Sequence, residues 1–269
     1  MPVSNPDGVA PLMAIALAAT EPGEPPPRVI ALVPRPSGGD RSESAEREGP
    51  APPTPALIAA IEYGRANGAA IETEPLWSDN PAADIISAAE SARVAWVLLG
   101  YHQSALGGDT MGGVVREVFA SARALPINLG VFIHGTNRPV DRVFAAVDAG
   151  ADGRAVLELA IRIARRDRRK LRALLVPGKI ARNEAGLVDL IRDARARLGR
   201  LFPADVLTKR SLNQLFSQTP GQLLIVGRSL ADELGLRLDE VPTRDRCVIV
   251  LQGAHLDSPS GTPHSDRPE

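Results

Sequence analysis

The chain has 269 residues, a length that favours two domains of ordinary size over one. Its apolar content of 44% is sufficient for two cores, whereas its net charge of -1 provides no overall field to attract nucleic acid or an anionic membrane. Cys247 is the one cysteine and lies in an apolar run, which excludes an intrachain disulfide and favours a buried thiol in a reducing cytosol.

The first half of the chain alternates apolar runs of strand length with amphipathic segments of helix length. We expect strands at residues 28–33, 69–75, 94–99 and 129–133, and helices at residues 9–19, 55–67, 81–92 and from about residue 113. The helix-like run at residues 9–19 is too short to cross a bilayer. Residues 34–54 are rich in Pro, Gly, Ser, Glu and Arg and lack apolar periodicity, so we expect a disordered loop there.

The second half repeats this order of elements after a turn-forming hinge at residues 135–139. We expect strands at residues 141–147, 171–176, 204–207, 223–226 and 247–251, and helices at residues 154–169, 184–200 and 211–217. Strands that alternate with helices imply right-handed crossovers and a doubly wound, mostly parallel sheet. The sequence therefore predicts an α/β chain of two such domains in tandem, at residues 1–135 and 136–253, followed by a disordered tail at residues 254–269.

A glycine-rich loop follows the strand predicted at residues 94–99 and leads into a helix. Gly100, Gly112 and Gly113 belong to this loop. Its backbone N–H groups, together with the positive end of the helix dipole, can hold an anion at the carboxyl edge of a parallel sheet. The alternative interpretation is that these glycines only form a tight turn.

His102 and Asp109 lie in the same loop, and a histidine beside a carboxylate can act as a general base. No Ser or Cys nucleophile at the spacing of a nucleophile elbow accompanies them, so we expect a histidine that bonds backbone or a partner, and no enzymatic activity. No pair of histidines has metal-ligand spacing, so we expect no metal site.

The densest charge in the chain is a basic cluster between residues 162 and 172. Its members are Arg162, Arg165, Arg166, Arg168, Arg169, Lys170 and Arg172. One interpretation is a contact with anionic lipid headgroups, RNA or an acidic partner surface. The other is a solvated face whose charge suits the carboxyl end of a helix dipole. Aromatic side chains that could stack on bases are absent nearby in the sequence, so nucleic acid is disfavoured as a partner.

The order of elements and the loop after Leu99 resemble the universal stress protein fold, here in tandem over residues 3–252. The resemblance implies flavodoxin-like domains with strand order 3-2-1-4-5 and, in ATP-binding members, a loop G-x2-G-x9-G-[ST]. Gly100 and Gly113 match the first and third glycines of that loop, whereas Gln103 and Val114 replace its second glycine and its hydroxyl residue. Glutamine brings a Cβ where the backbone must approach closely, and valine removes a hydroxyl donor.

The second half departs further from the same loop pattern. Gly227 matches the first glycine, but Leu230 and Glu240 occupy the other two glycine positions, and a carboxylate there would repel phosphate. Asp148 matches the acidic residue that ends the first strand in nucleotide-binding members. Neither half therefore has a complete nucleotide-binding set, and we expect no cofactor beyond a possible adenine nucleotide.

A second resemblance is to the paired stress-protein module at the cytosolic end of bacterial monovalent cation/proton antiporters. It rests on Leu98-Leu-Gly-Tyr-His-Gln and on Met111-Gly-Gly-Val-Val-Arg-Glu-Val. The resemblance implies a cytoplasmic, non-enzymatic regulatory module at the inner face of a membrane, partnered by a transport domain that is fused or separate. The alternative is a stand-alone cytosolic stress protein that binds ATP or a cyclic dinucleotide.

The candidate ligand contacts under either hypothesis are the loop residues and the acidic strand end: Gly100, His102, Gly112, Gly113 and Asp148. In this family the last strand of each domain pairs with another copy. We therefore expect the strands at residues 129–133 and 248–251 to pair, either with each other in an intramolecular pseudo-dimer or with a second copy in a homodimer. Either pairing would remove exposed sheet edges. The first strand, which should precede Val3, is largely missing, so we expect the chain to begin inside the fold.

Overall fold

The computed structural model describes residues 1–35, 49–101, 113–135, 140–148, 150–166, 168–175, 184–198, 204–206, 221–235 and 247–254. Its strands are β1 (Pro2–Val3), β2 (Arg28–Pro34), β3 (Glu72–Ser78), β4 (Trp96–Gly100), β5 (Asn128–His134), β6 (Arg142–Val147), β7 (Lys170–Leu175), β8 (Ala204–Val206), β9 (Gln222–Gly227) and β10 (Cys247–Gln252). Its helices are α1 (Val9–Ala19), α3 (Pro55–Ala66), α4 (Pro81–Ser91), α5 (Gly113–Ser121), α6 (Ala151–Arg166), α7 (Glu184–Leu198) and α9 (Arg228–Leu234), with short 3-10 turns η1 (Pro6–Gly8) and η2 (Ala122–Ala124). The helix predicted at residues 211–217 lies outside the described residues.

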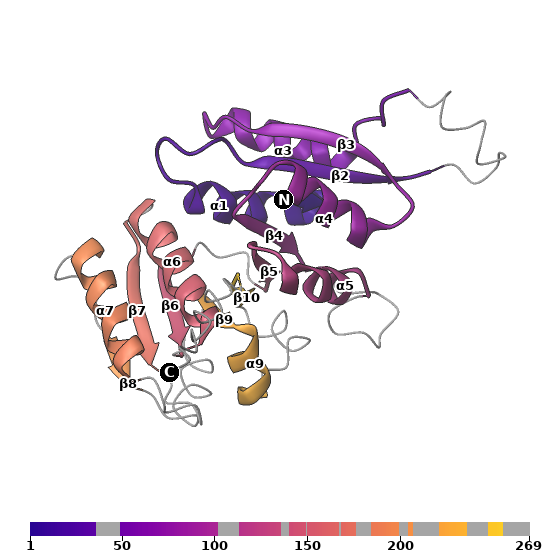
Figure 1. Cartoon of the computed structure of the whole chain (residues 1–269). Helices are drawn as coiled ribbons and strands as arrows, with labels where there is room; N and C mark the ends of the chain where they lie inside the picture. Colours follow the sequence, from indigo (N-terminus) through magenta and orange to yellow (C-terminus); the bar gives the residue numbers. More distant parts are fainter. Residues whose placement is uncertain are drawn as a thin grey trace, which may run out of the picture.

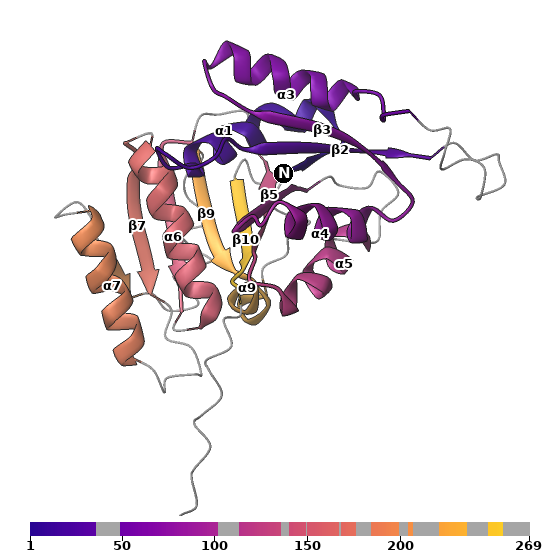
Figure 2. The same cartoon turned by 45° about the horizontal axis from the view of Figure 1, so that its top comes forward.

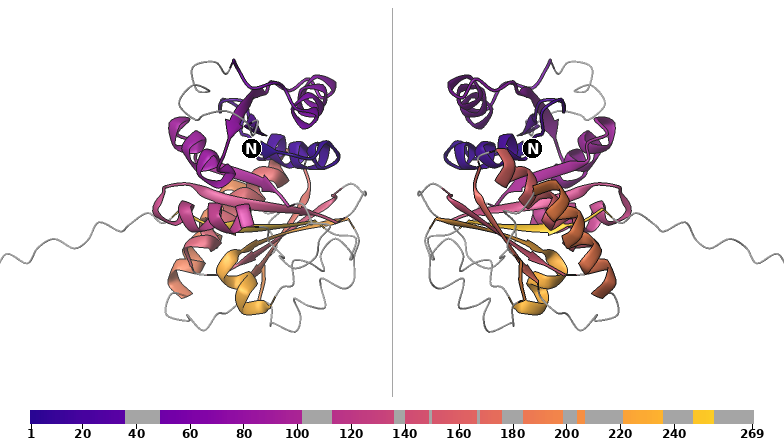
Figure 3. Two further views of the ribbon diagram at one scale, coloured as in Figure 1. Left: turned by 90° about the vertical axis from the view of Figure 1, so that its right-hand side faces the viewer. Right: turned by 90° about the vertical axis from the view of Figure 1, so that its left-hand side faces the viewer.

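The strands form two sheets, and Figures 1 and 3 show the smaller one above the larger one. The smaller sheet has the order β1-β2-β3 and the larger has the order β4-β5-β10-β9-β6-β7-β8. Within the second half the parallel order is therefore β8-β7-β6-β9-β10, which is the predicted 3-2-1-4-5 order. The first half keeps the sequence β3-β2-β1 followed by β4-β5, but the sheet is interrupted between β1 and β4. The predicted α/β class with doubly wound parallel strands is confirmed, while the division at residue 135 stays a prediction.

The two halves are joined inside the larger sheet by β5 and β10, its second and third strands. This pair is antiparallel and in register from Cys247 opposite His134 to Gln252 opposite Leu129, whereas the other strand pairs among the described residues are parallel. The predicted pairing between the last strands of the two halves is confirmed, and it is made within one chain.

The core consists of two apolar clusters on opposite faces of the larger sheet. Alternate residues of β10 point to each cluster: Ile249 and Leu251 to one, Val248 and Val250 to the other. The first cluster packs α1 and α3 of the first half against α6 of the second half, and Figure 2 shows α1 lying beside α6. The second cluster packs α4 and α5 together with α9. Both clusters therefore draw on both halves of the chain, and Cys247 is buried among them as predicted.

The strand predicted at residues 69–75 is displaced along the chain in the structure. It forms as β3 from Glu72 to Ser78, because residues before it complete the end of α3: Gly68 takes a positive φ of 59° and the Ala69 N–H donates to the Gly64 carbonyl. The sequence predicts that the strand ends at Pro75, but Pro75 lies inside β3. This is possible because β3 is at the edge of its sheet, where a proline nitrogen needs no partner.

Residues 36–48 of the predicted disordered loop lie outside the described residues. The described residues beside them are bonded to the fold: the Trp77 indole N–H donates to the Gly49 carbonyl at 3.0 Å, and the Thr54 hydroxyl accepts from the Leu57 N–H at 3.2 Å. Thr54 is thereby the N-cap of α3.

The pairing of β5 with β10 is tested by the substitution Ile249→Pro. Ile249 is fully buried between Phe132 and Ile225, and proline removes an N–H from the centre of a sheet. We expect the free energy of unfolding in urea to fall by at least about 3 kcal/mol. The control Ile249→Val keeps the ladder and should cost about 1 kcal/mol. Equal losses in the two variants, or unchanged resistance of the whole chain to limited proteolysis, would contradict the role given to this pair.

Candidate functional site

The structure places the described candidate residues at the carboxyl ends of strands. Gly100 ends β4, Gly113 begins α5, and Asp148 follows β6. His102 and Gly112, with the rest of residues 102–112, lie outside the described residues. A hydrogen bond from the Tyr101 N–H to the Phe132 carbonyl, at 2.8 Å, holds the chain against β5 just before the loop. Only the two ends of the loop are described, so the anion site stays a prediction.

The two ends of this loop have different surroundings. A Cβ on Gly100 would lie 3.3 Å from Cδ2 of Leu12, so α1 packs closely on the backbone there. A Cβ on Gly113 would meet nothing within 4 Å. The small residue at Gly100 is therefore explained by helix packing, without a ligand. The open backbone at Gly113 leaves the start of α5 accessible.

Asp148 is half-buried and takes part in the turn that begins α6. Its Oδ1 accepts a hydrogen bond from the Gly150 N–H at 3.0 Å. Burial raises the pKa of the Asp148 carboxyl, and the charges of Asp152 and Glu233 raise this pKa further, against the lowering effect of the Gly150 hydrogen bond. A Cβ on Gly153 would lie 2.1 Å from the Asp148 carbonyl oxygen, so α6 can begin here only with glycine at that position. The carboxyl group is thus within a tight turn and is easier to protonate than a free aspartate.

Asp152 is a buried carboxylate at this edge of the sheet that sequence reasoning missed. It is 7% exposed; its Oδ1 accepts from the Gly253 N–H at 2.8 Å, and its Oδ2 accepts from the N–H and the hydroxyl of Ser229, both at 3.2 Å. Ser229 lies in the first turn of α9 and Gly253 follows β10. The carboxylate therefore lies at the carboxyl edge of the sheet, in the half whose loop departs further from the phosphate-binding pattern. The only indication of this role in the sequence was that Asp152 is an acidic residue near the start of a predicted helix.

The loop pattern of the second half does not form as a loop in the described residues. Helix α9 begins at Arg228, directly after Gly227, and Leu230 is a buried core residue of that helix. A Cβ on Gly227 would lie 2.7 Å from Cβ of Asp152, so this glycine makes room for the aspartate. Glu240 lies outside the described residues. The matched glycine in this half is therefore explained by contact with Asp152.

A polar cluster at the end of β10 connects the two halves in addition to the β5–β10 strand pair. Gln252 is 4% exposed; its amide donates to the Phe119 carbonyl at 3.1 Å and accepts from Arg228 at 3.1 Å. The Arg228 guanidinium lies 4.7 Å from the centre of the Phe119 ring. Asn128 at the start of β5 accepts from the Ala254 N–H at 2.9 Å. These contacts satisfy buried polar groups across the junction.

Part of the basic cluster is paired with acidic residues of the first half. Arg162 lies 2.7 Å from Glu24 and 2.9 Å from Glu158, and its guanidinium lies 6.0 Å from the centre of the Trp96 ring. Arg165 lies 3.4 Å from Glu21. The acidic surface expected of a partner is therefore supplied, for these two residues, by the same chain. Arg166, Arg168, Lys170 and Arg172 are exposed, as the solvated-face alternative predicts.

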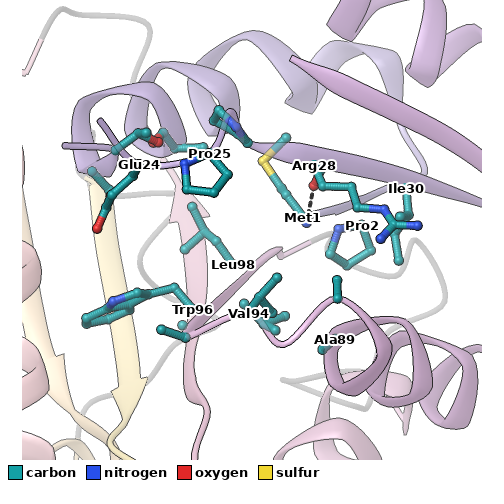
Figure 4. A pocket seen from close by; sticks show the side chains of 18 of the residues that line it. Met1, Pro2, Glu24, Pro25, Arg28, Ile30, Ala89, Val94, Trp96 and Leu98 are labelled. Atoms are coloured by element: carbon teal, nitrogen blue, oxygen red, sulfur yellow. Dashed lines mark hydrogen bonds between the residues drawn. The ribbon is translucent and has the colours of Figure 1, made fainter. Parts of the chain in front are cut away.

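A cavity of about 560 Å³ lies between β1, β2 and β4 (Figure 4). Its walls are mainly apolar and include Leu98 and Trp96, and its charged side chains are those of Glu24, Arg28, Glu72, Arg93 and Arg162. The Met1 amino group donates to the Arg28 carbonyl at 2.7 Å. Burial, followed by the charge of Arg28, lowers the pKa of this amino group to about 5. No sequence pattern indicated this cavity, because its walls come from elements far apart in the chain.

Metal and membrane features were also sought among the described residues. These residues contain no group of three or more His, Cys, Asp or Glu side chains arranged to hold a metal ion. None of the described helices combines the length and the apolar character needed to cross a membrane.

The fold and this geometry can be compared with known proteins. No family model matches the chain, and no curated protein matches it. The crystal structure of the cytoplasmic domain of a prokaryotic cation chloride cotransporter is similar, with a TM-score of 0.62, 13% identity and 94% of each chain covered. A universal stress protein from Archaeoglobus fulgidus DSM 4304 is similar with a TM-score of 0.56 and 16% identity, over 94% of this chain and 95% of that one.

These likenesses define the class of structure. The chain has the universal stress protein fold, and the predicted resemblance to stress proteins and to the cytosolic part of a transporter is confirmed at the level of the fold. At these identities the comparison shows the fold alone, so the kind of transporter stays a prediction.

Asp152 is tested by Asp152→Ala. Its removal leaves the Ser229 and Gly253 N–H groups without their acceptor, so the free energy of unfolding should fall by about 3 kcal/mol. Asp232→Ala, which changes an exposed residue of α9, should stay within about 0.5 kcal/mol of the parent protein. Urea titration measures both variants, and a loss for Asp152→Ala no larger than that for the control would contradict the role assigned to Asp152.

Asp148 is tested by the pH dependence of Asp148→Asn. Because its carboxyl pKa is raised on folding, the parent protein loses stability as pH rises from about 3.8 through the folded pKa. The asparagine variant lacks this loss. Its stability relative to the parent should therefore be greater at pH 7 than at about pH 3.5. Asp141→Asn, at an exposed residue, serves as control and should show a smaller change with pH. A relative stability of Asp148→Asn that is the same at both pH values would show that burial of Asp148 carries no penalty.

Proposed function

We propose that the chain is a non-enzymatic regulatory module of a monovalent cation/proton antiporter system, acting from the cytosolic side on a transport domain that is fused or separate. The observation that carries this proposal is the position of the Asp152 carboxylate at the carboxyl edge of the sheet in the second half. The likeness to the cytoplasmic domain of a cation chloride cotransporter, over 94% of both chains, supports a transporter-linked role. The sequence from Leu98 to Gln103 and from Met111 to Val118 favours the antiporter branch.

The Asp152 contact argues against nucleotide turnover in the second half. The donors that could face an anion, the Ser229 N–H, its hydroxyl and the Gly253 N–H, already bond this carboxylate. A phosphate brought to the same place would meet a negative charge and would have to displace three hydrogen bonds. The second half therefore supplies a structural carboxylate where a nucleotide-binding protein needs a free nest of N–H groups.

A module of this kind regulates only through differential binding to two states of its transporter. A coupling free energy of about 1–3 kcal/mol changes an apparent affinity by about 5- to 150-fold. The β5–β10 pair and the Arg162 contacts hold both halves together, so a contact made by one half also orients the other. This rigidity suits a unit that reports the position of a transport domain.

The transporter role is tested with everted membrane vesicles from cells that contain or lack this chain. Cation-driven proton movement, followed with a pH-sensitive dye, should show a cation concentration for half-maximal response that is shifted by about 5-fold or more. Sodium and potassium are tested separately. Identical responses with and without the chain, for both ions, would contradict the proposal.

A second candidate function is a stand-alone stress protein that binds ATP or a cyclic dinucleotide. The observation that favours it is Asp148, whose half-buried carboxyl at the end of β6 can accept a hydrogen bond from a ribose or base. Calorimetric titration with ATP and with cyclic di-AMP separates the two candidates. We expect no saturable heat; micromolar binding that is lost in Asp148→Ala or Gly113→Val would instead favour the nucleotide-binding function.

A further inference from the structure

The basic cluster of the sequence separates into two parts in the structure. Its earlier members bond acidic residues of the first half, whereas Arg166, Arg168 and Lys170 are exposed and form no ion pair among the described residues. These three residues belong to the turn that joins α6 to β7. Strands β6 and β7 run in the same direction (Figure 1), so Arg142, the first residue of β6, lies beside this turn. We define the basic edge as Arg142, Arg166, Arg168 and Lys170.

Two cations of the basic edge are in register with each other. Arg142 of β6 lies opposite Lys170 of β7 in a parallel ladder, so their side chains leave the same face of the sheet at adjacent positions. Like charges placed in this way repel each other and lower stability. The carboxylate of Asp141 lies 3.9 Å from Arg142, but in a largely exposed pair, which contributes little. A solvated face does not require this juxtaposition of charges, whereas an anionic partner would offset its cost.

The opposite edge of the same half, where β6 and β9 end, is acidic. Asp152 and Glu233 lie close enough to Asp148 for their charges to raise the pKa of its carboxyl. The described charged residues at this edge include Asp148, Asp152, Arg154, Arg228, Asp232 and Glu233. Carboxylates outnumber cations among them, so the second half has its positive charge at one edge and its negative charge at the other. The net charge of -1 for the whole chain does not show this separation.

We propose that the basic edge lies against the anionic lipid surface of a membrane, with the acidic edge of the second half turned away from it. The choice of a membrane as partner rests on the proposed function, which places the chain beside a transport domain on the cytosolic side. Each Lys or Arg near an anionic bilayer changes partitioning by about fivefold, so the four residues together give on the order of several hundredfold. Binding of this strength is reversible, and it orients a module that a transport domain already holds at the membrane.

The chemistry of the basic edge fits lipid headgroups better than RNA or an acidic protein. Bases bind by stacking on aromatic side chains, and the sequence from Arg166 to Arg172 contains no aromatic residue. A protein interface usually has an apolar centre, whereas Leu171, the apolar residue beside Lys170, is buried in the core. An anionic lipid surface requires only cations within a Debye length, which is about 10 Å at 0.1 M salt.

Flotation of the purified full chain with lipid vesicles tests the proposal. One set of vesicles contains equal parts of phosphatidylcholine and phosphatidylglycerol, and the other contains phosphatidylcholine alone. The chain should bind the anionic vesicles at low salt and should not bind the neutral ones. Raising the salt concentration to about 1 M, where the Debye length is about 3 Å, should release the bound chain.

Variants of the turn between α6 and β7 identify the surface that binds. The triple variant Arg166→Gln, Arg168→Gln, Lys170→Gln should bind anionic vesicles about 100-fold more weakly than the parent chain. The charge-preserving variant Arg166→Lys, Arg168→Lys, Lys170→Arg should bind as the parent does, because a lipid surface responds to charge. All three positions are exposed, so Tm should not change in either variant.

A matched control removes the same number of positive charges elsewhere. Arg65→Gln, Arg93→Gln and Arg154→Gln replace three exposed cations outside the basic edge, and together they should change binding by less than about fivefold.

The orientation on the membrane is measured by energy transfer to an acceptor on the lipid headgroups. A fluorophore on Asp141→Cys, beside the basic edge, should transfer energy more efficiently than one on Asp232→Cys, an exposed position of α9 at the acidic edge. Cys247 is buried, so the label goes to the introduced cysteine.

The inference is overturned by equal binding to neutral and anionic vesicles, by an equal loss of binding in the turn variant and its control, or by equal energy transfer from the two labels. Stronger binding to poly(U) RNA or to polyglutamate than to anionic vesicles at the same salt would assign the basic edge to another partner and would also overturn it.

These measurements use lipid alone and require no transporter. A chain that shifts the cation response of membrane vesicles without binding lipid would therefore refute this inference and leave the proposed function standing. A chain that binds lipid without shifting that response would refute the proposed function alone.

Discussion

The antiparallel pairing of β5 with β10 is the constraint on which the arrangement of the rest depends. Each is the last strand of its half, and each would otherwise be an exposed edge with a row of unpaired N–H and C=O groups. Paired with each other, they are interior strands of a seven-stranded sheet, and all six residues of β10 are fully or almost fully buried. The junction is tight enough that a Cβ on Gly130 would lie 2.9 Å from Leu251 and 3.1 Å from Leu98.

The polar contacts of the molecule follow from this junction. Gln252 ends β10 and reaches the Phe119 carbonyl in the first half, while Gly253, one residue later, donates to Asp152. Arg162 crosses between the halves on the other side of the sheet and is 14% exposed, with two carboxylates and a carbonyl around it. A buried guanidinium is tolerated only when its donors are satisfied. Each of these groups is satisfied because the strand pair fixes the register of the two halves.

The repeating order of strands and helices was predictable from the sequence because it rests on local periodicity. The long apolar runs at β5 and β10 identified both as strands, since a strand buried on both faces contains few polar residues, whereas their pairing was implied by the resemblance to stress proteins. The predicted boundaries of β3 were wrong because Gly68 and Ala69 complete the end of α3. The backbone conformation that ends a helix there is not visible in the composition. Gly100 and Gly227 matched a phosphate-loop pattern, yet packing against Leu12 and Asp152 accounts for both. Asp152 was missed because its three donors come from residues at least 77 positions away in the chain.

The same topological position serves different ends in the two halves. In the second half, β6 is a full strand between β7 and β9, and the edge of the sheet above it is closed by the Asp152 carboxylate. In the first half, the corresponding β1 has two residues, and a mainly apolar cavity lies beside it. The repeated fold gives both halves an equivalent place beside the first strand. The side chains and the length of that strand decide whether a cavity forms there. Since the Asp152 carboxylate already occupies N–H groups at this edge of the second half, whereas a cavity lies beside β1 in the first half, the two halves offer different surroundings at the same topological position.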